Sequence, residues 1–188
     1  MKLRRRRAAS ILVLGALAAI GLFPARSGAQ RADVWTLKVA FVERIASFLT
    51  WPEDADLERP ERPFIWTFLG KTPLVSRAEA IYAHRRIQSH SVVIRTAQHA
   101  SEIGPTHVLF VAATCKEDIG RIVARLGGAP VLTVADAPGM AQRGVAVNLY
   151  QENDKIRFEI NRRSLRRARI RASFRLLTLA RIIPEPEP

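Results

Sequence analysis

The stretch of sequence that decides the fold is residues 107–136, HVLFVAATCKEDIGRIVARLGGAPVLTVAD. Its first part, 107–112, predicts a strand apolar enough to be buried on both faces, and 131–134 predicts a further strand. Between them, 116–126 predicts a helix that the following glycine pair ends. Because strands alternate with a helix here, the stretch is typical of a largely parallel sheet covered by helices.

The chain upstream continues this alternation. Apolar residues at spacings of three and four predict an amphipathic helix over 34–49, and Trp51-Pro52 ends it because the residue before a proline disfavours helical conformation. An acidic loop over 53–63 follows. Beyond it, the patterns predict a strand at 64–69, a helix from Thr72-Pro73 to His84 and a strand at 91–95.

The chain downstream predicts a hairpin and a closing helix. Strands at 144–150 and 155–160 are joined by a turn at 151–154, and a helix covers 171–183. Together the elements predict an α/β fold: a single-domain sandwich with a mixed, mostly parallel sheet of about six strands flanked by helices. The hairpin supplies antiparallel strands at the edge of this sheet. The domain covers 30–183, and 184–188 form a disordered tail.

Residues 1–29 predict a cleaved secretory signal peptide. Lys2 and the arginine run at 4–7 form a positively charged start, 11–23 form a short apolar core, and Ser27-Gly28-Ala29 provides the small residues that a signal peptidase recognises. A helix that spans a bilayer needs about 20 apolar residues, and this core is shorter. We therefore expect export to the periplasm, with an uncleaved N-terminal anchor as the alternative.

The positive charge of the mature chain lies at one end. The formal net charge is +13, but residues 1–29 hold six of the 30 Lys and Arg and none of the 17 acids. Residues 155–181 hold ten Lys or Arg and one acid, Glu159. This basic end could bind nucleic acid, which an exported protein rarely meets, or an anionic lipid surface. It could also dock an acidic protein, or form a solvated face whose arginine stems cover a seam between helix and sheet. We favour the solvated face and expect no nucleic-acid partner.

Motifs for catalysis and cofactor binding are absent from the sequence. No glycine-rich nucleotide loop follows the strand at 64–69, and neither a complete Walker loop nor a Gly-x-Ser-x-Gly elbow occurs. The four histidines lie in separate predicted elements, without the spacing of a metal-binding helix. Cys115 is the only cysteine, so it is a free thiol or forms an intermolecular bridge. We therefore predict no catalytic residue, no metal and no cofactor.

A series of short sequence pieces, in order and at set spacings, carries a resemblance to a known family. The pieces are Lys38-Val39-Ala40-Phe41, Phe48-Leu49-Thr50-Trp51-Pro52, Phe68-Leu69-Gly70 with Pro73, Val108-Leu109-Phe110-Val111, Val131-Leu132-Thr133-Val134-Ala135-Asp136, Phe158-Glu159-Ile160-Asn161, Arg175-Leu176-Leu177 and Leu179-Ala180-Arg181-Ile182-Ile183. They resemble the YfiR family of periplasmic regulators, also called HmsC-like. The resemblance covers nearly all of the mature domain.

This resemblance implies a regulator without catalytic activity. Members of the family bind and repress the extracytoplasmic part of an inner-membrane diguanylate cyclase with a GGDEF domain, and so lower cyclic di-GMP and biofilm formation. An outer-membrane lipoprotein that binds peptidoglycan can draw the repressor away. The alternative is a periplasmic sensor module that binds a small ligand, for which we expect an apolar pocket with a few polar groups. The sequence leaves the oligomeric state open, including a homodimer.

The resemblance also bears on individual residues. Family members often have one cysteine near the first strand and another at the third, where this chain has Thr67-Phe68 and Thr106-His107. Redox control through such a bridge is therefore in doubt. Partner-contacting residues that we place on one surface are Glu159, Asn161, Arg175 and Arg181, with Trp51 and Asp136 near it. Structural roles are the alternative: Asn161 caps the following helix, Trp51 packs at the end of the first helix, and Arg181 and Glu159 pair within the protein.

Overall fold

The computed structural model describes residues 33–185. Its elements are α1 Val34–Ala46, β1 Leu49–Thr50, η1 Glu53–Ala55, β2 Phe64–Leu69, α2 Leu74–Tyr82, β3 Val92–Ala97, η2 Ala100–Glu102, β4 Val108–Val111, α3 Ile119–Arg125, β5 Leu132–Ala135, β6 Val147–Glu152, β7 Lys155–Ile160, α4 Arg162–Arg167, β8 Arg171–Ala172, α5 Phe174–Leu179 and β9 Arg181–Ile182. The predicted signal peptide, 1–29, lies outside the described residues, as do residues 186–188 of the predicted tail.

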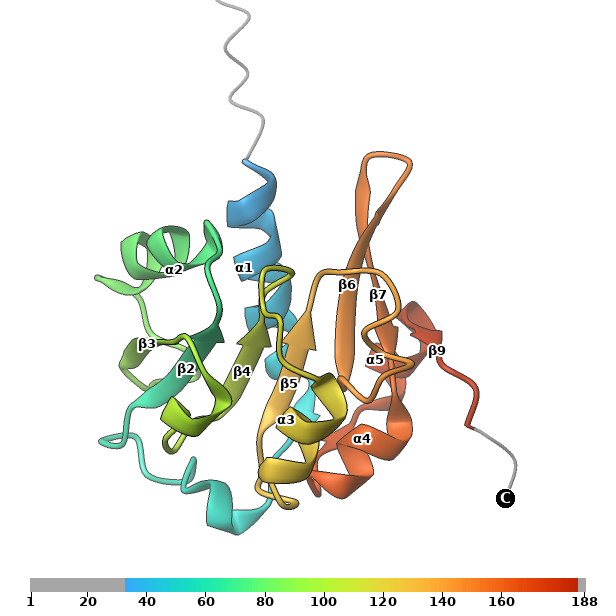
Figure 1. The fold of residues 1–188 in the computed structure, drawn as a ribbon. Coiled ribbons are helices and arrows are strands. Elements are labelled where there is room, and N and C mark those ends of the chain that lie inside the picture. The colour runs from blue at the N-terminus through green and yellow to red at the C-terminus, as the bar shows by residue number, and fades with distance from the viewer. Residues whose placement is uncertain (1–32, 186–188) are drawn as a thin grey trace, which may run out of the picture. The chain divides into compact units, whose positions relative to one another are not determined.

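A seven-stranded sheet in the order β3-β2-β4-β5-β6-β7-β9 forms the centre of the fold (Figure 1). Neighbouring strands are parallel from β3 to β6, whereas β6 and β7 form an antiparallel hairpin and β9 runs parallel to β7. Asn153 and Asp154 have φ angles of 49° and 58°, as the tight turn of a two-residue hairpin loop requires. The predicted α/β fold with a mixed, mostly parallel sheet is confirmed, and β9 raises the number of strands to seven.

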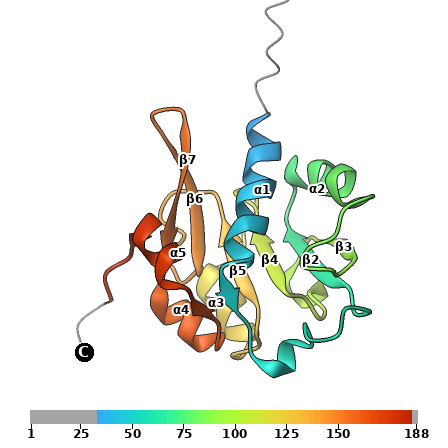
Figure 2. The same ribbon diagram turned by 180° about the vertical axis from the view of Figure 1, so that it is seen from behind.

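Two hydrophobic cores lie on the two faces of this sheet. Side chains along a strand alternate between faces, so Val108 and Phe110 of β4 pack in the core that contains α1 and α2, whereas Leu109 and Val111 pack in the core that contains α3. Figure 1 shows α3 in front of the sheet, and Figure 2 shows α1 on the opposite face. Every residue of β4 is buried, as its continuous apolar sequence predicts.

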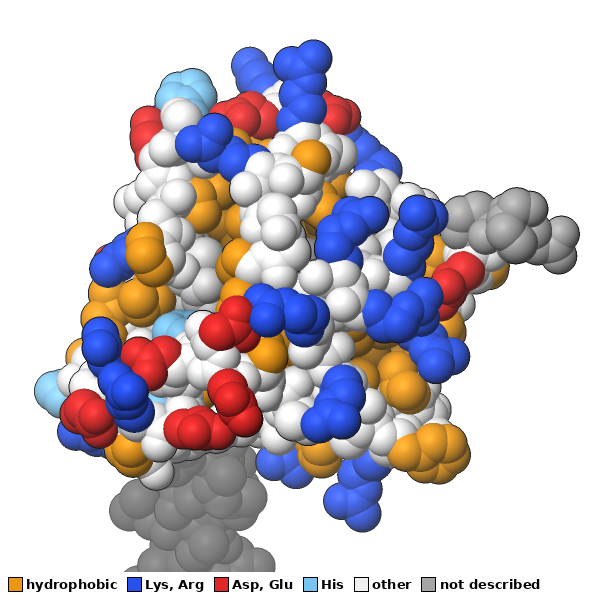
Figure 3. Space-filling model, turned by 90° about the horizontal axis from the view of Figure 1, so that it is seen from below, with side chains coloured by type: hydrophobic (Ala, Val, Ile, Leu, Met, Phe, Trp, Pro, Cys, Tyr) orange, Lys and Arg blue, Asp and Glu red, His pale blue; other side chains and the backbone are white. Residues whose placement is uncertain are grey.

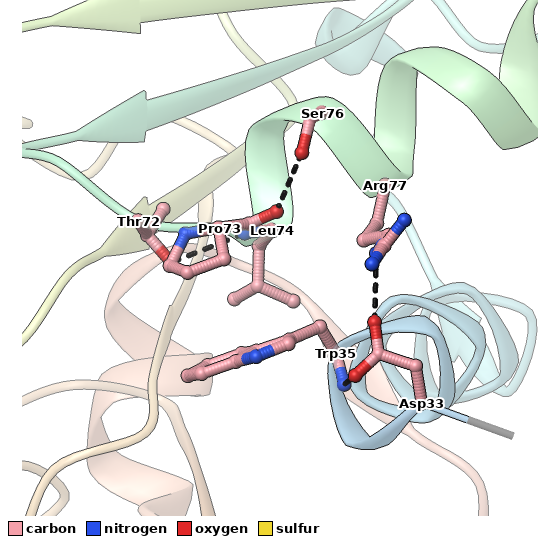
Figure 4. Close-up of polar contacts among 7 residues, drawn as sticks. All are labelled: Asp33, Trp35, Thr72, Pro73, Leu74, Ser76 and Arg77. Carbon is pink, nitrogen blue, oxygen red and sulfur yellow. Dashed lines mark hydrogen bonds and ion pairs between the residues drawn. The ribbon is translucent and has the colours of Figure 1, made fainter. Parts of the chain in front are cut away.

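Polar contacts at the N-terminus of α1 join the two helices of the first core (Figure 4). Asp33 is the N-cap of α1, and its carboxylate accepts a hydrogen bond from the backbone N–H of Trp35 at 3.4 Å. The same carboxylate accepts a bond of 2.7 Å from Arg77 Nε of α2. Thr72 accepts a bond from the N–H of Leu74 at the start of α2. One aspartate thus satisfies a free N–H of one helix and pairs with a charge on the other.

The largest difference from the sequence prediction is the closing helix over 171–183. The structure has α5, flanked by the short strands β8 and β9. Arg169 has a φ of 56°, in the left-handed region, and separates α4 from β8. Beyond β8, Ser173 caps α5 and donates its backbone N–H to the carbonyl of Phe48. Local periodicity favours one helix here. Its two ends are instead the strands β8 and β9, which pair with strands distant in sequence.

The same pairing shortens the first helix. We predict a helix over 34–49, whereas α1 ends at Ala46 because Leu49 and Thr50 pair with Ala172 and Arg171 as the two-stranded sheet β1-β8. Four further predicted ranges differ from the structure by two or three residues at one end or both. The ranges 91–95, 116–126 and 144–150 correspond to β3, α3 and β6, and the helix predicted to reach His84 is α2, which ends at Tyr82. The start of α3 is set by Asp118, whose side chain accepts a bond from the N–H of Arg121.

Candidate protein-interaction surface

Three of the predicted partner-contacting residues lie together at the edge of the sheet that β7 and β9 form. Glu159 of β7 is opposite Arg181 of β9 in register, and on its other side it is opposite Asn148 of β6. Its carboxylate accepts a hydrogen bond of 3.2 Å from Asn148 Nδ2 and forms a hydrogen-bonded ion pair with Arg181 Nη2. Asn161 follows β7 directly. The positions expected from sequence thus belong to one edge of the fold.

Burial makes the Glu159–Arg181 pair a structural contact. Glu159 is 2% exposed, and a buried carboxylate is costly unless it is paired and hydrogen-bonded. The Arg181 side chain is 58% exposed, and its guanidinium lies 4.7 Å from the ring centre of Tyr150. The hydrogen bond to Glu159 raises the pKa of Arg181. Arg181 therefore fastens the two-residue strand β9 to the sheet and keeps one side of its guanidinium open to solvent.

Asn161 links two segments. Its Oδ1 accepts a hydrogen bond of 3.0 Å from the N–H of Ser164, as expected of an N-cap residue for α4. Its Nδ2 donates a bond of 2.7 Å to the carbonyl of Ala141, in the connection between β5 and β6. Both ends of the amide are thus used inside the protein. Asn161 therefore positions α4 against that connection.

Trp51 and Asp136 lie at opposite ends of the central strands. Trp51 contacts Phe64 and His107 edge-to-face, with ring centres 6.2 and 6.4 Å apart, and these two residues stand at the amino ends of β2 and β4. Asp136 follows the carboxyl end of β5, where it forms an ion pair of 2.6 Å with Lys38 of α1. Asp136 therefore lies on the α1 side of a central strand, two strands from β7. The structure brings neither Trp51 nor Asp136 into contact with the Glu159–Arg181 pair.

Exposed apolar side chains at this end belong to the closing segment 174–182. Among the described residues, five large hydrophobic side chains are exposed, and three of them belong to this segment. Phe174 is 82% exposed, Leu179 66% and Ile182 37%. α5 buries only Leu176. Clustered exposed apolar groups mark surfaces that contact other molecules.

Sequence reasoning missed these three apolar residues. A helix over 171–183 would turn Phe174 toward the sheet with its apolar neighbours, so the pattern indicates core rather than surface. The available signal is Ser173, an N-cap residue that starts a new helix at Phe174. A helix that starts there and lasts six residues can bury little more than one side chain.

Arginines flank the apolar groups. Arg171, Arg175 and Arg181 are exposed, and α4 next to them carries four more arginines. Figure 3 shows the right half of the molecule's lower face with many Lys and Arg side chains beside hydrophobic groups, whereas most acidic side chains lie in the left half, mixed with further Lys and Arg. We call segment 174–182 with Arg171 the closing surface. Its composition, apolar groups rimmed by arginine, is that of a protein interface.

Comparison with known proteins identifies the family of this chain. The model of the YfiR/HmsC-like family matches residues 36–181. The chain belongs to the YfiR/HmsC-like family. No curated protein matches the sequence closely enough to count as a relative. Among solved structures, a conserved domain protein from Vibrio cholerae O1 biovar El Tor strain N16961 superposes with a TM-score of 0.51 and 11% identity, over 79% of this chain and 59% of that one. The chain thus spans less than two thirds of that structure, which supports the fold alone.

Two sequence pieces of the YfiR/HmsC-like family meet in the pair described above. Phe158-Glu159-Ile160-Asn161 supplies the buried carboxylate and the helix cap, and Leu179-Ala180-Arg181-Ile182-Ile183 supplies the arginine that pairs with it. At the positions where the resemblance implies cysteines, Thr67 donates a hydrogen bond of 2.9 Å to the hydroxyl of Thr106, and both side chains are buried. This contact links β2 to the residue before His107 without a covalent bridge.

The YfiR/HmsC-like family is known as regulatory rather than catalytic. Within residues 33–185, no group of three or more His, Cys, Asp or Glu side chains could hold a metal ion. Cys115 is a half-buried free thiol. In the same range, no helix combines the length and the apolarity that a membrane crossing needs. Family membership supports a regulatory role in general, and the closing surface is the candidate contact area.

Proposed function

We propose that the protein is a non-enzymatic periplasmic regulator that binds the periplasmic domain of an inner-membrane diguanylate cyclase and represses it. Repression follows if the regulator binds the low-activity state of the cyclase more tightly than the active state. Lower cyclic di-GMP and less biofilm are the consequences. Family membership and the signal-like sequence of residues 1–29 support this proposal. An outer-membrane lipoprotein that binds peptidoglycan would release the cyclase by competing for the regulator.

The observation that carries the proposed contact is Phe174. Its side chain is 82% exposed, and Arg175 within the same helix and Arg171 before it are exposed cations. Large aromatic side chains surrounded by a polar rim are the usual energetic centres of protein interfaces. The closing surface therefore offers an apolar anchor together with charges that orient an acidic partner.

A strain that carries the cyclase tests the proposal. Deleting the gene of the regulator should raise cyclic di-GMP, and the wild-type gene should lower it again. F174E should fail to lower it, because a carboxylate would enter the apolar centre of the interface. L37E is the matched control, because Leu37 is a 41% exposed apolar residue on α1. Unchanged cyclic di-GMP after deletion would contradict the proposed function. Full repression by F174E would show that the contact with the cyclase does not include Phe174.

The alternative function, a sensor for a small ligand, is favoured by one groove. It has a volume of about 710 Å³ and combines apolar residues such as Ile103 and Leu126 with polar ones such as His107 and Arg125, in the size range of ligand pockets. Its carboxylates are already paired, Asp54 with Arg169 and Asp56 with Arg62. A thermal-shift screen with periplasmic metabolites tests this function. It is supported if a metabolite raises the melting temperature of the wild type and if I103W, which fills the groove, abolishes this shift.

A further inference from the structure

The tail of the chain places a carboxylate on the arginines of α4. Glu185 follows β9, and its two carboxylate oxygens accept hydrogen bonds of 2.9 and 2.5 Å from the two terminal nitrogens of Arg166. Two parallel bonds from one guanidinium to one carboxylate are the strongest form of this contact. Both side chains remain about half exposed, at 56% and 43%. α4 thus holds a carboxylate on its solvent side.

More positive charge faces this carboxylate than it neutralises. The pKa of Glu185 is lowered, first by the hydrogen bond from Arg166 and further by the charges of Arg162 and Arg163. Within residues 33–185, the ion pairs of α4 and of the two residues after it involve only Arg166 and Arg169. Arg162 and Arg163 therefore have charge available for a further acid. We call Arg162, Arg163 and Arg166 the arginine face.

A groove continues from the arginine face toward α3. Its volume is about 1040 Å³. Arg143, Arg163 and Arg167 contribute charge to its lining, Gly127 and Gly128 contribute exposed backbone, and Pro184 with Glu185 form part of its wall. Pro184 and Glu185 thus lie along the groove. A segment of another chain that carries carboxylates would find the same contacts there.

We propose that the arginine face binds an acidic segment of a partner protein, and that Glu185 covers part of this face until the partner displaces it. The contact of Glu185 shows which chemistry fits, since a carboxylate accepts both hydrogen bonds of the Arg166 guanidinium. Exposed ion pairs are weak, so a partner with several acids displaces a single tail residue. This inference does not depend on the identity of a cyclase, and the arginine face belongs to α4, whereas Phe174 and Leu179 belong to α5.

Fluorescence anisotropy with a labelled hexaglutamate peptide tests this inference on the purified chain. E185Q should bind the peptide about two- to fivefold more tightly than the wild type, because the tail no longer competes. R162Q/R163Q/R166Q should bind it at least about tenfold more weakly. The matched control is R77Q/R85Q/R86Q, which removes the same charge from α2 and its C-terminal connection. Binding by this control should equal that of the wild type.

Three results would overturn the inference. E185Q could bind no more tightly than the wild type, in which case the tail does not compete. The control and the arginine-face variant could weaken equally, so that net charge alone attracts the peptide. Phosphatidylglycerol vesicles or single-stranded DNA could bind through the arginine face more tightly than the peptide, so that the partner is not a protein. E185Q changes an exposed side chain, so its result stands even if the triple variant unfolds. The assay contains no cyclase, so failure here leaves the proposed function separately testable.

Discussion

At the scale of single residues, the Glu159–Arg181 pair is asymmetric. Glu159 is buried and Arg181 is mostly exposed. Loss of the arginine leaves a carboxylate in the protein interior without a counterion, whereas loss of the carboxylate leaves an arginine that water can solvate. The two partners therefore differ in what their removal costs. Removal of Arg181 should therefore cost more free energy of unfolding than removal of Glu159.

Substitution of each partner tests this asymmetry. We expect E159Q to lower the free energy of unfolding by about 1–2 kcal/mol, since an amide keeps part of the hydrogen bonding. R181M should lower it more, and E159Q/R181M should recover most of the loss caused by R181M, because no charge is then left buried. Urea unfolding of the three variants measures this. Strictly additive effects would argue that the two side chains do not interact.

His107 predicts a dependence of stability on pH. Its Nδ1 accepts a hydrogen bond from the N–H of Ile65, and its Nε2 lies 2.9 Å from the carbonyl of Ala55, so the neutral ring serves both. Burial lowers its pKa below the ordinary value of 6.5. The unfolded chain therefore takes up a proton before the folded one does. The stabilisation is complete above this ordinary value and is lost as the pH falls through the folded pKa.

Comparison with H107Q isolates this effect. Between about pH 7.5 and about pH 5.5, the free energy of unfolding of the wild type should fall more steeply than that of H107Q. At the upper pH, H107Q should be less stable by about 1–3 kcal/mol, because the N–H of Ile65 loses its acceptor. Urea unfolding at a series of pH values measures both quantities. Parallel pH curves would show that another group controls acid stability.

At the scale of elements, sequence predicts what local pattern determines. The range of β2 and that of β7 are predicted correctly, because an apolar run or an alternation ends there at a turn. The closing helix is wrong because β8 and β9 depend on partners far away in sequence, Leu49–Thr50 and Glu159–Ile160. A strand of two residues is too short to show an alternating pattern, so its pairing cannot be predicted from the local sequence.

Two helix caps at this end should differ in their contribution to stability. Ser173 caps α5 by accepting a bond from the N–H of Leu176, whereas Asn161 caps α4 and also binds Ala141. S173A should lower the free energy of unfolding by about 1 kcal/mol and N161A by about 2 kcal/mol. N161D keeps the acceptor and should fall between N161A and the wild type. Urea unfolding compares the three. Equal costs for S173A and N161A would show that the bond to Ala141 contributes nothing.

At the scale of the whole molecule, the candidate surface depends on which residues the fold leaves exposed. The sequence predicts Glu159, Asn161 and Arg181 on one surface, and in the structure these side chains form hydrogen bonds with other groups of the same protein. Phe174, which is apolar in sequence, is the most exposed large hydrophobic residue described. Composition cannot distinguish these cases, because burial follows from the packing of α5 on the sheet. The exposed apolar residues of the closing surface therefore could not be predicted from sequence.

The separation of apolar and charged groups predicts how a complex with an acidic partner forms and dissociates. Arginines act at long range and are screened by salt, whereas the apolar contact of Phe174 acts only once the proteins touch. In stopped-flow binding to the proposed partner, the periplasmic domain of a diguanylate cyclase, raising the salt from about 50 to about 300 mM should lower the association rate about tenfold and leave the dissociation rate nearly unchanged. F174E should do the reverse and mainly accelerate dissociation, with L37E as the control. If salt changed only the dissociation rate, the arginines would act as contacts within the complex rather than as guides to its formation.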